Sequence, residues 1–480
     1  MNAVDPPAAD PHPSRRRALA RLAAGAGALA APALLSGCTG ATASTAAVAR
    51  TARPSPSGSG PGTAASGAAP GAMRLFDDPD VNFQALFALG SAGQHSSDVG
   101  EVLSAVNTIN KAGPSNQSYT ATFNSWGDRL TSQATQAGAD GDQRTQCRRA
   151  LRASSYYEQA LYFVLGSDDP GSEKAVYLAF RQAWDVFAKN CSPAADLVSV
   201  RYGSTAMPVW FFRPDTSSRR RPTLILTNGS DGQNTDMWTY GVAAALDRGW
   251  NAVVYNGPGQ GELLFVGEVA MTTRWENVVR PIVDYLFTRD DVDHGRVAIS
   301  GFSLGGQLAP RAAAFDSRLA AVVAAPGCLS LWSAFPPQIR QILGPTKAGT
   351  NSTWNKDVVP HLSAADRFTL NKRFELYDPA VLRAARQGRI FTDFWTPARV
   401  ISGLDITKVV QRIKAPTLVV DFEFEQFFPG QARKLYDLLR CPKHYVEMTR
   451  AQGAQLHCSP MAPQYYCEVV LDWLDRTLHT

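Results

Sequence analysis

The 480-residue sequence lacks the patterns that mark a metal site, a nucleic-acid surface or a bundle of membrane spans. It has seven cysteines and seven histidines but no C-x-x-C pair and no dense His/Cys cluster, so it offers no structural zinc site. A formal net charge of +5, part of it in Arg15–Arg17, leaves the rest of the chain close to neutral, which excludes a broad basic surface for nucleic acid. After residue 40, no segment has the apolar length of a membrane span.

Residues 1–38 have the features of an export signal. The run Arg15–Arg17 precedes a weakly apolar stretch of Ala, Gly and Leu that ends in Leu-Ser-Gly-Cys at Cys38. The arginines resemble a twin-arginine signal, and the last four residues resemble a bacterial lipobox, whose cysteine becomes the lipidated first residue. An ordinary secretory signal, or a short tail with an accidental cysteine, is the alternative. We expect an exported protein, either a cell-envelope lipoprotein or one released outside the cytoplasm, that meets the membrane only through Cys38.

Export bears on the other six cysteines, because oxidising compartments permit disulfides and six cysteines allow fifteen pairings. A Cys147–Cys191 bridge, together with a bridge among Cys441, Cys458 and Cys467, is one reading of the sequence. Six reduced thiols are the other, and the sequence leaves both open.

The composition of the chain changes twice after the signal. Residues 39–73 are Ser, Thr, Ala, Gly and Pro with almost nothing to bury, which is typical of a flexible linker. Residues 74–200 then carry apolar side chains at three- and four-residue spacing, for example in "QRTQCRRALRASSYYEQALYFVLG" and "EKAVYLAFRQAWDVFAKN". We expect this part to be a helical cap domain.

Residues 201–480 have a different hydrophobic pattern. Short apolar runs such as "PTLILTNG", "NAVVYNGPG", "RVAISG" and "APTLVVDFE" alternate with helical segments. Fully apolar strands that alternate with helices indicate a mostly parallel, doubly wound sheet, with the functional groups at the carboxyl ends of its strands. Residues from about 328 to 412 are rich in Trp, Phe and Pro and are too many for a loop, so we expect an inserted lid there.

One stretch, "RVAISGFSLGGQ", points to a nucleophile. An apolar strand leads through Gly301 into Ser303, and Gly305 then opens a helical segment. In a nucleophile elbow, small residues on both sides let a strained turn lift the serine hydroxyl above the sheet, at the positive end of a helix. Ser303 is therefore the candidate nucleophile.

A serine nucleophile needs a base, and few histidines qualify. His457 lies in a Gly-containing loop after the last apolar run, and such a loop opens on the same edge of the sheet as the elbow. The others lie in unsuitable places: in the signal, the helical domain, the start of the elbow strand, the insertion, the start of a strand and the C-terminus (His12, His95, His294, His361, His444 and His479). His457 is the candidate base.

The third member of a triad is expected after "APTLVV", where three carboxylates alternate. Any of them could orient the imidazole. Glu425 lies furthest past the strand, so we prefer it to Glu423 and then Asp421.

The oxyanion hole is expected from two backbone N–H groups, that of Leu304 and one in the loop after "TLILTNG". Ser230 or Asp231 is the candidate for the second. The Asp231 side chain fits a helix cap better than a substrate contact.

Taken together, "RASSYYEQALYFVLGSDDP", "LTNGSDG", "YNGPGQGE", "GFSLGG", "FFPGQARKLYDLL" and "GAQLHC" resemble one branch of the α/β hydrolases over roughly residues 74–480. This is the branch of 2,6-dihydroxypseudooxynicotine hydrolase-like and fermentation-respiration-switch-like proteins, which have a helical domain before the hydrolase core. The resemblance implies the α/β-hydrolase fold and esterase or carbon–carbon hydrolase activity. Relatives typically read Glu-x-Asp just before a Phe-Phe-Pro stretch, and their Asp is the triad acid. That Asp falls on Glu425, so this chain departs from the pattern there, with Phe424 as the intervening residue.

These observations predict an exported serine hydrolase that uses no metal or organic cofactor. Its partner would be a small apolar or aromatic carbonyl substrate, cleaved at an ester or at a carbon–carbon bond of a β-diketone-like compound. A homodimer is compatible with the sequence. An exopeptidase is an alternative, and so is a non-catalytic lipid-anchored binding protein with a degenerate triad.

Overall fold

The computed structural model describes residues 74–480. The predicted export signal, Cys38 and the linker 39–73 lie outside the described residues. Among the helices that are described, none has the length and apolarity to cross a membrane.

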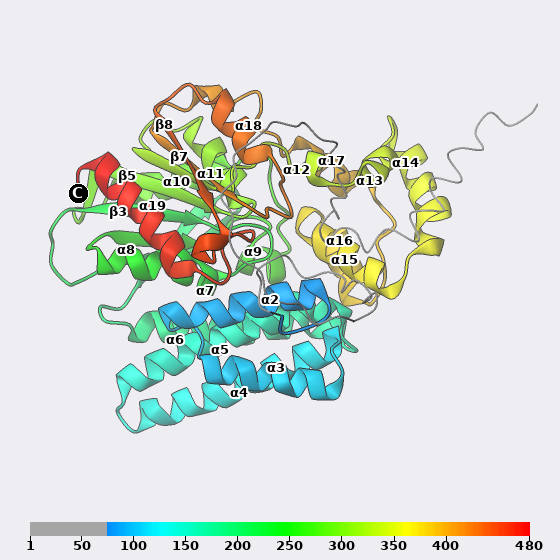
Figure 1. The fold of residues 1–480 in the computed structure, drawn as a ribbon, viewed down its shortest axis with the longest axis horizontal. Coiled ribbons are helices and arrows are strands. Elements are labelled where there is room, and N and C mark those ends of the chain that lie inside the picture. Colours follow the sequence, from blue (N-terminus) through cyan, green and yellow to red (C-terminus); the bar gives the residue numbers. More distant parts are fainter. Residues whose placement is uncertain (1–73) are drawn as a thin grey trace, which may run out of the picture.

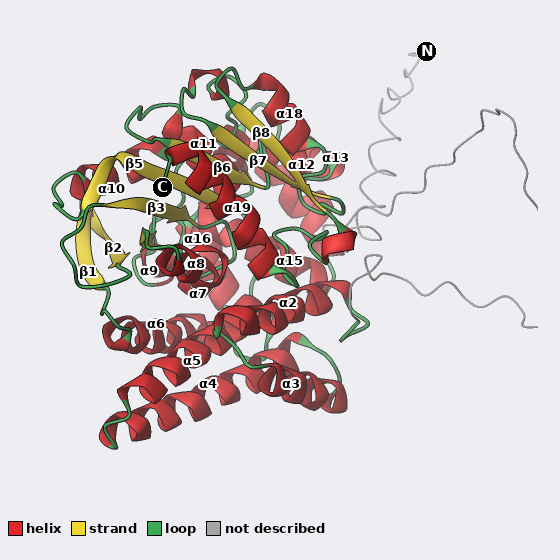
Figure 2. Ribbon diagram, turned by 60° about the vertical axis from the view of Figure 1, so that its left-hand side comes forward, coloured by secondary structure: helices red, strands yellow, loops and turns green. Residues whose placement is uncertain are grey.

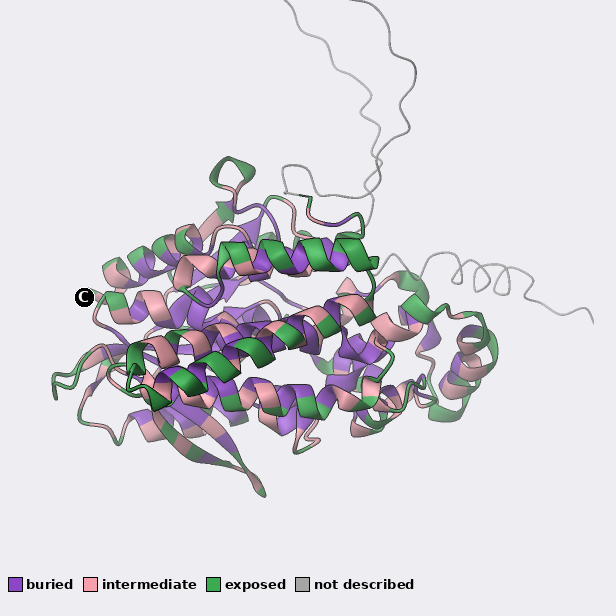
Figure 3. Ribbon diagram, turned by 90° about the horizontal axis from the view of Figure 1, so that it is seen from below, coloured by how far each residue is buried: buried purple, intermediate pink, exposed green. Residues whose placement is uncertain are grey.

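The described chain begins with a layer of helices below the sheet (Figure 1). They are α2 (Pro79–Gly90), α3 (Val99–Ala112), α4 (Asn116–Ala139), α5 (Gln143–Phe163) and α6 (Glu173–Asn190). Side chains of Asp78, Asp98 and Ser115 accept hydrogen bonds from free N–H groups and so start the first three helices. From below, these helices show exposed residues on one face and buried residues on the other (Figure 3). The helical segment expected from the spacing is confirmed.

An eight-stranded sheet forms the centre of the molecule (Figure 2). Its strands are β1 (Asp196–Tyr202), β2 (Thr205–Phe212), β3 (Arg221–Thr227), β4 (Asn251–Tyr255), β5 (Val292–Phe302), β6 (Ala321–Ala325), β7 (Thr417–Phe422) and β8 (Lys443–Met448). The order is β1-β2-β4-β3-β5-β6-β7-β8, and only the pairings of β2 with β1 and β4 are antiparallel. Every residue of β4, β6 and β7 is buried, as a sheet covered on both faces requires. The predicted α/β-hydrolase fold is confirmed.

Two sets of helices cover the sheet. The helices that follow its strands are α7 (Asn234–Met237), α8 (Ala243–Asp247), α9 (Gly261–Phe265), α10 (Glu276–Leu286), α11 (Gly305–Ala313), α18 (Gln431–Leu438) and α19 (Pro463–Leu478). Helix α19 packs on α8 and β6, whereas α11 packs on α10, β5 and β6. The consecutive crossover helices α10 and α11 therefore pack against each other, as do α8 and the C-terminal α19.

An insertion separates β6 from β7, at the place where the sequence predicts a lid (Figure 1, yellow). It contains α12 (Leu331–Ala334), α13 (Pro337–Ile342), α14 (Lys347–Thr353), α15 (Ala364–Phe374), the short turn η8 (Glu375–Tyr377), α16 (Pro379–Arg386) and α17 (Trp395–Gly403). Aromatic rings hold it together: Phe391 stacks on both Trp354 and Phe374 at centroid distances of 5.0 and 5.2 Å. The aromatic residues that mark the insertion in the sequence thus form its own small core.

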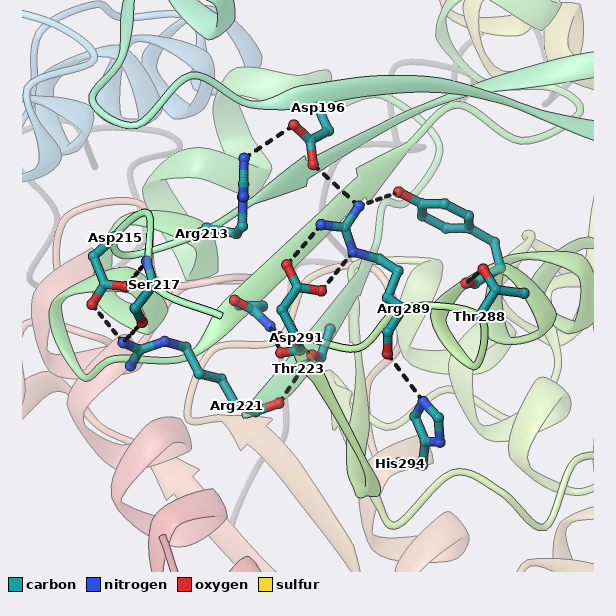
Figure 4. Close-up of polar contacts among 12 residues, drawn as sticks. Asp196, Arg213, Asp215, Ser217, Arg221, Thr223, Thr288, Arg289, Asp291 and His294 are labelled. Carbon is teal, nitrogen blue, oxygen red and sulfur yellow. Dashed lines mark hydrogen bonds and ion pairs between the residues drawn. The ribbon is translucent and has the colours of Figure 1, made fainter. Parts of the chain in front are cut away.

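The amino edge of the sheet carries a network of ion pairs (Figure 4). The Arg289 guanidinium donates to both Asp291 oxygens at 2.8 and 2.7 Å and lies 3.1 Å from Asp196. His294 is part of this edge, where Nε2 lies 3.3 Å from the Arg289 carbonyl oxygen and the ring stacks on Phe287. As the strand order implies, His294 is at the opposite end of β5 from Ser303.

Of the two readings of the cysteines, the bridged one is wrong. All six described cysteines are free. The Cys147 thiol faces the Phe187 carbonyl, and the Cys191 thiol faces the carbonyls of its own turn, so the two sulfurs do not meet. The reading with six reduced thiols agrees with the structure.

Candidate active site

The turn between β5 and α11 holds Ser303 in a left-handed conformation, with φ of 57°. A non-glycine residue is strained there, and such strain is typical of a nucleophile elbow. The neighbours must be glycines because a Cβ on Gly301 would lie 1.8 Å from the Gly305 carbonyl oxygen, and one on Gly305 would lie 2.2 Å from the Thr227 carbonyl oxygen. The backbone thus presents the serine at the carboxyl edge of the sheet.

Three predicted side chains meet in a line at this edge. His457 Nε2 lies 3.0 Å from Ser303 Oγ, and His457 Nδ1 lies 2.8 Å from each oxygen of Glu425. The carboxylate of Glu425 also accepts the backbone N–H groups of Phe427 and Phe428 at 2.9 and 3.0 Å. These two hydrogen bonds from its own loop hold the Glu425 carboxylate in place against the imidazole.

The other two carboxylates after β7 have different partners. Glu423 accepts the backbone N–H of Arg450 at 2.7 Å, and Asp421 accepts the Tyr445 hydroxyl at 2.6 Å. Burial raises the pKa of Asp421. Of the three candidates in the sequence, only Glu425 touches His457.

Phe424, the residue before the candidate acid, helps to bring acid and base together. Its backbone N–H donates to the Gln455 carbonyl at 2.8 Å, and it forms a parallel bridge with Leu456. This bridge aligns the loop after β7 with the loop that carries His457. The imidazole and the Glu425 carboxylate, 5% and 3% exposed, are packed against Phe427, whose ring centroid lies 4.7 Å from that of the imidazole.

The predicted oxyanion residues lie beside the serine. Leu304 starts α11, and a Cβ on Gly229 would lie 2.7 Å from Ser303 Cβ and 3.0 Å from Leu304 N, so the loop after β3 passes directly over the elbow. Within the described part of the chain, the N–H groups of Leu304 and Ser230 donate to no protein acceptor. Both donors are available at the elbow.

The expectation that Asp231 caps the next helix is wrong. The N-cap of α7 is Gln233, and no side chain caps it. Asp231 instead forms an ion pair with Arg373 of the insertion at 2.5 Å. The Asp231 carboxylate therefore pairs with an arginine 142 positions away and not with the nearby helix end.

Ser303 and His457 open into a cavity of about 800 Å³. Its apolar lining comes from α2, the insertion and the acid loop, for example Phe83, Phe335 and Phe427. Its polar lining includes Glu158 and Asp236, whose carboxyl groups hydrogen-bond to each other.

Burial raises the pKa of both carboxyls in this pair, that of Asp236 to about 6, because a desolvated carboxylate is costly. The pair therefore keeps a proton to higher pH than free carboxyl groups do. No sequence signal marks this pair, because Glu158 lies within an aromatic helical run that is typical of core packing and Asp236 opens an ordinary helix.

No metal centre is found in residues 74–480, where no three His, Cys, Asp or Glu side chains gather as ligands.

The sequence matches the model of the alpha/beta hydrolase family over residues 224–457, from β3 to the candidate base. It is similar to alpha/beta hydrolase psoB of Aspergillus fumigatus, at 28% identity over 431 residues that cover 84% of this chain and 94% of the relative. It is also similar to 20-hydroxy-prefusarin hydrolase FUS2 of Gibberella moniliformis, at 30% identity over 271 residues; these cover 54% of this chain and 63% of that relative's length.

Two solved structures share the fold. The crystal structure of 2,6-dihydroxy-pseudo-oxynicotine hydrolase superposes with a TM-score of 0.59 at 19% identity, covering 81% of this chain and 95% of the other. The structure named AbyA5 wildtype superposes with a TM-score of 0.52 at 17% identity, covering 83% and 99%. The family match, the central sheet and the N-terminal helical segment together lead to one conclusion: the chain has the α/β-hydrolase fold and carries the sequence pattern of the alpha/beta hydrolase family over residues 224–457.

Proposed function

We propose that the protein is a serine hydrolase that uses Ser303, His457 and Glu425 to cleave a small-molecule carbonyl substrate. The observation that carries the proposal is the continuous chain of contacts from the serine through the imidazole to the carboxylate, at 3.0 and 2.8 Å. Nucleophile, base and orienting acid in contact are the geometric signature of a triad.

In this mechanism, Ser303 Oγ attacks the substrate carbonyl while His457 Nε2 takes the hydroxyl proton. The Glu425 carboxylate keeps the imidazole in the tautomer that accepts at Nε2 and stabilises the imidazolium that forms. The N–H groups of Leu304 and Ser230 stabilise the oxyanion. His457 then protonates the leaving group, and a water molecule releases the acyl group by the reverse sequence.

The cavity supports a substrate of drug-like size with a large apolar part. Its volume is about 800 Å³ and most of its surface is apolar, as in sites that bury most of an organic ligand. One similar protein is named a 20-hydroxy-prefusarin hydrolase, after a small-molecule substrate. An ester and a carbon–carbon bond beside a carbonyl are both substrates for the same triad. The intact contacts of the triad favour an enzyme over a binding protein.

A panel of aryl esters, alkyl esters, β-diketones and aminoacyl amides on the purified full-length protein tests this proposal. We expect turnover of at least one ester or β-diketone, and Ser303→Ala lowers kcat by roughly 10⁴-fold or more. Ser402→Ala, a change in the last turn of α17, is the control and keeps wild-type turnover. Turnover that persists in Ser303→Ala would reject the triad, and turnover of aminoacyl amides alone would favour the exopeptidase.

Export through residues 1–38 is a second proposal and rests on the sequence alone. Cys38→Ala is expected to release the protein from the membrane fraction. Unchanged membrane association of this variant would reject lipidation at Cys38.

A further inference from the structure

The four segments that build the candidate site meet at one side chain, Arg373 of α15. Its guanidinium donates to Asp231 Oδ2 in the loop after β3 at 2.5 Å and to the Tyr162 hydroxyl of α5 at 3.1 Å. It also lies over the ring of Phe427, in the loop of the triad acid, at 5.4 Å from the ring centroid. Arg373 thus joins the insertion to the helical segment, the oxyanion loop and the acid loop.

Tyr377, one helical turn further along the insertion, contacts the same loop. Its hydroxyl and the Ser230 side chain hydrogen-bond to each other, and Tyr377 is 3% exposed. Arg373 lies in the last turn of α15 and Tyr377 in the turn η8 that follows directly, and the two reach the consecutive residues Asp231 and Ser230. The two contacts fix the stretch of backbone that carries the Ser230 N–H.

Charge gives Arg373 a second role. The Asp231 carboxylate follows directly after the predicted oxyanion donor, and in a partly buried site its negative charge opposes a developing oxyanion. Arg373 is the cation paired with it, and Asp80 of α2 adds a further negative charge within electrostatic range of the guanidinium. Without Arg373, the oxyanion would form beside a carboxylate that has lost its ion-pair partner.

We propose that Arg373 and Tyr377 are positioning residues through which the insertion holds the oxyanion loop, Ser230–Asp231, over Ser303, and that Arg373 cancels the Asp231 charge there. The inference rests on the proposed function, because it assigns a role in the same reaction. The insertion therefore positions the oxyanion hole in addition to lining the cavity.

The test compares variants of the full chain with the ester or β-diketone that the wild type turns over. Arg373→Met is expected to lower kcat by roughly 100-fold, the usual cost of one oxyanion donor, with KM changed less than about threefold. Tyr377→Phe loses only the hydrogen bond to Ser230 and is expected to lower kcat by about tenfold. Arg367→Met is the matched control in the same helix, because its guanidinium binds only carbonyls of the insertion, at Leu362 and Val359.

Two further readouts separate positioning from a merely structural role. A trifluoromethyl ketone forms a tetrahedral adduct on the serine, and its affinity should fall by the same factor as kcat/KM in each variant. Adding Asp231→Asn to Arg373→Met removes the uncompensated charge and is expected to restore kcat about tenfold.

A wild-type kcat in both Arg373→Met and Tyr377→Phe, or no rescue by Asp231→Asn, would overturn the proposal. If Arg373→Met does not fold by circular dichroism, the Tyr377→Phe result decides alone. A wild type that neither turns over any substrate nor binds the ketone refutes the proposed function, and this inference with it. An active wild type with insensitive variants refutes this inference only.

Discussion

Charged side chains have different surroundings at the two edges of the sheet. At the amino edge, Arg289 pairs with Asp291 and Asp196, and the arginine holds the pKa of Asp291 below its usual value (Figure 4). At the carboxyl edge, burial raises the pKa values of Glu158 and Asp236, and a cavity replaces the closed network.

The two histidines illustrate the same contrast. His294 at the amino edge contacts a backbone carbonyl and a stacked ring, whereas His457 at the carboxyl edge contacts a serine and a carboxylate. Ser303 adds backbone strain at that edge. Ion pairs stabilise the amino edge of the sheet. At the carboxyl edge, unpaired backbone donors and the strained Ser303 lower the stability of the fold.

The largest effect is expected at the carboxyl edge from Glu425→Gln. The amide keeps the size of the side chain but cannot hold the imidazole in the required tautomer, so kcat should fall by roughly 10³–10⁴-fold. Glu423→Gln is the matched control, two positions earlier and bonded to Arg450, and should stay within about twofold of wild type. Steady-state kinetics decides, and a larger loss at Glu423 would reject Glu425 as the acid.

A smaller effect, on stability alone, is expected at the amino edge. Asp291→Asn breaks the two-point pair with Arg289 and should lower the free energy of unfolding by about 2 kcal/mol near neutral pH. The neighbouring Asp290 is exposed, so Asp290→Asn serves as the control with no measurable change. Urea denaturation gives the stability, and kcat/KM should remain that of the wild type. Lost activity at unchanged stability would show that this edge serves the reaction.

The smallest effect concerns pH. Burial raises the pKa of Asp236 from 3.8 to about 6, so between these pH values the native protein binds more protons than the unfolded chain. Raising the pH through this window therefore lowers the free energy of unfolding, and the contribution of the protonated pair is lost above it. Asp236→Asn should make the variant more stable relative to wild type, by on the order of 1 kcal/mol, between about pH 4.5 and pH 7.5. Urea denaturation at both pH values measures this. A parallel pH dependence of the two proteins would contradict the raised pKa of Asp236.

Sequence patterns were sufficient for the elements whose signals are local. Buried apolar runs predict the parallel strands, and the glycines around Ser303 predict the elbow, because both depend on residues a few positions apart. The structure brings Ser303, His457 and Glu425 together, but the choice of Glu425 over its neighbours depends on the bridge between Phe424 and Leu456, a pairing of distant segments.

Other parts of the site had no local signal. Arg373 lies 142 positions from Asp231, and the partners Glu158 and Asp236 come from the helical segment and the sheet domain. Their importance arises from long-range packing that places charges side by side. For the cysteines, the sequence signal was misleading. An even number of cysteines allowed disulfides, but the Cys147 thiol faces the Phe187 carbonyl and forms none.

The most direct test of the account is covalent labelling of the full-length protein with a fluorophosphonate, read by mass spectrometry. We predict one adduct in the wild type, on the peptide that contains Ser303, and none in Ser303→Ala. An unlabelled wild type under conditions where a control serine hydrolase reacts, or an adduct that persists in Ser303→Ala, would contradict the central claim.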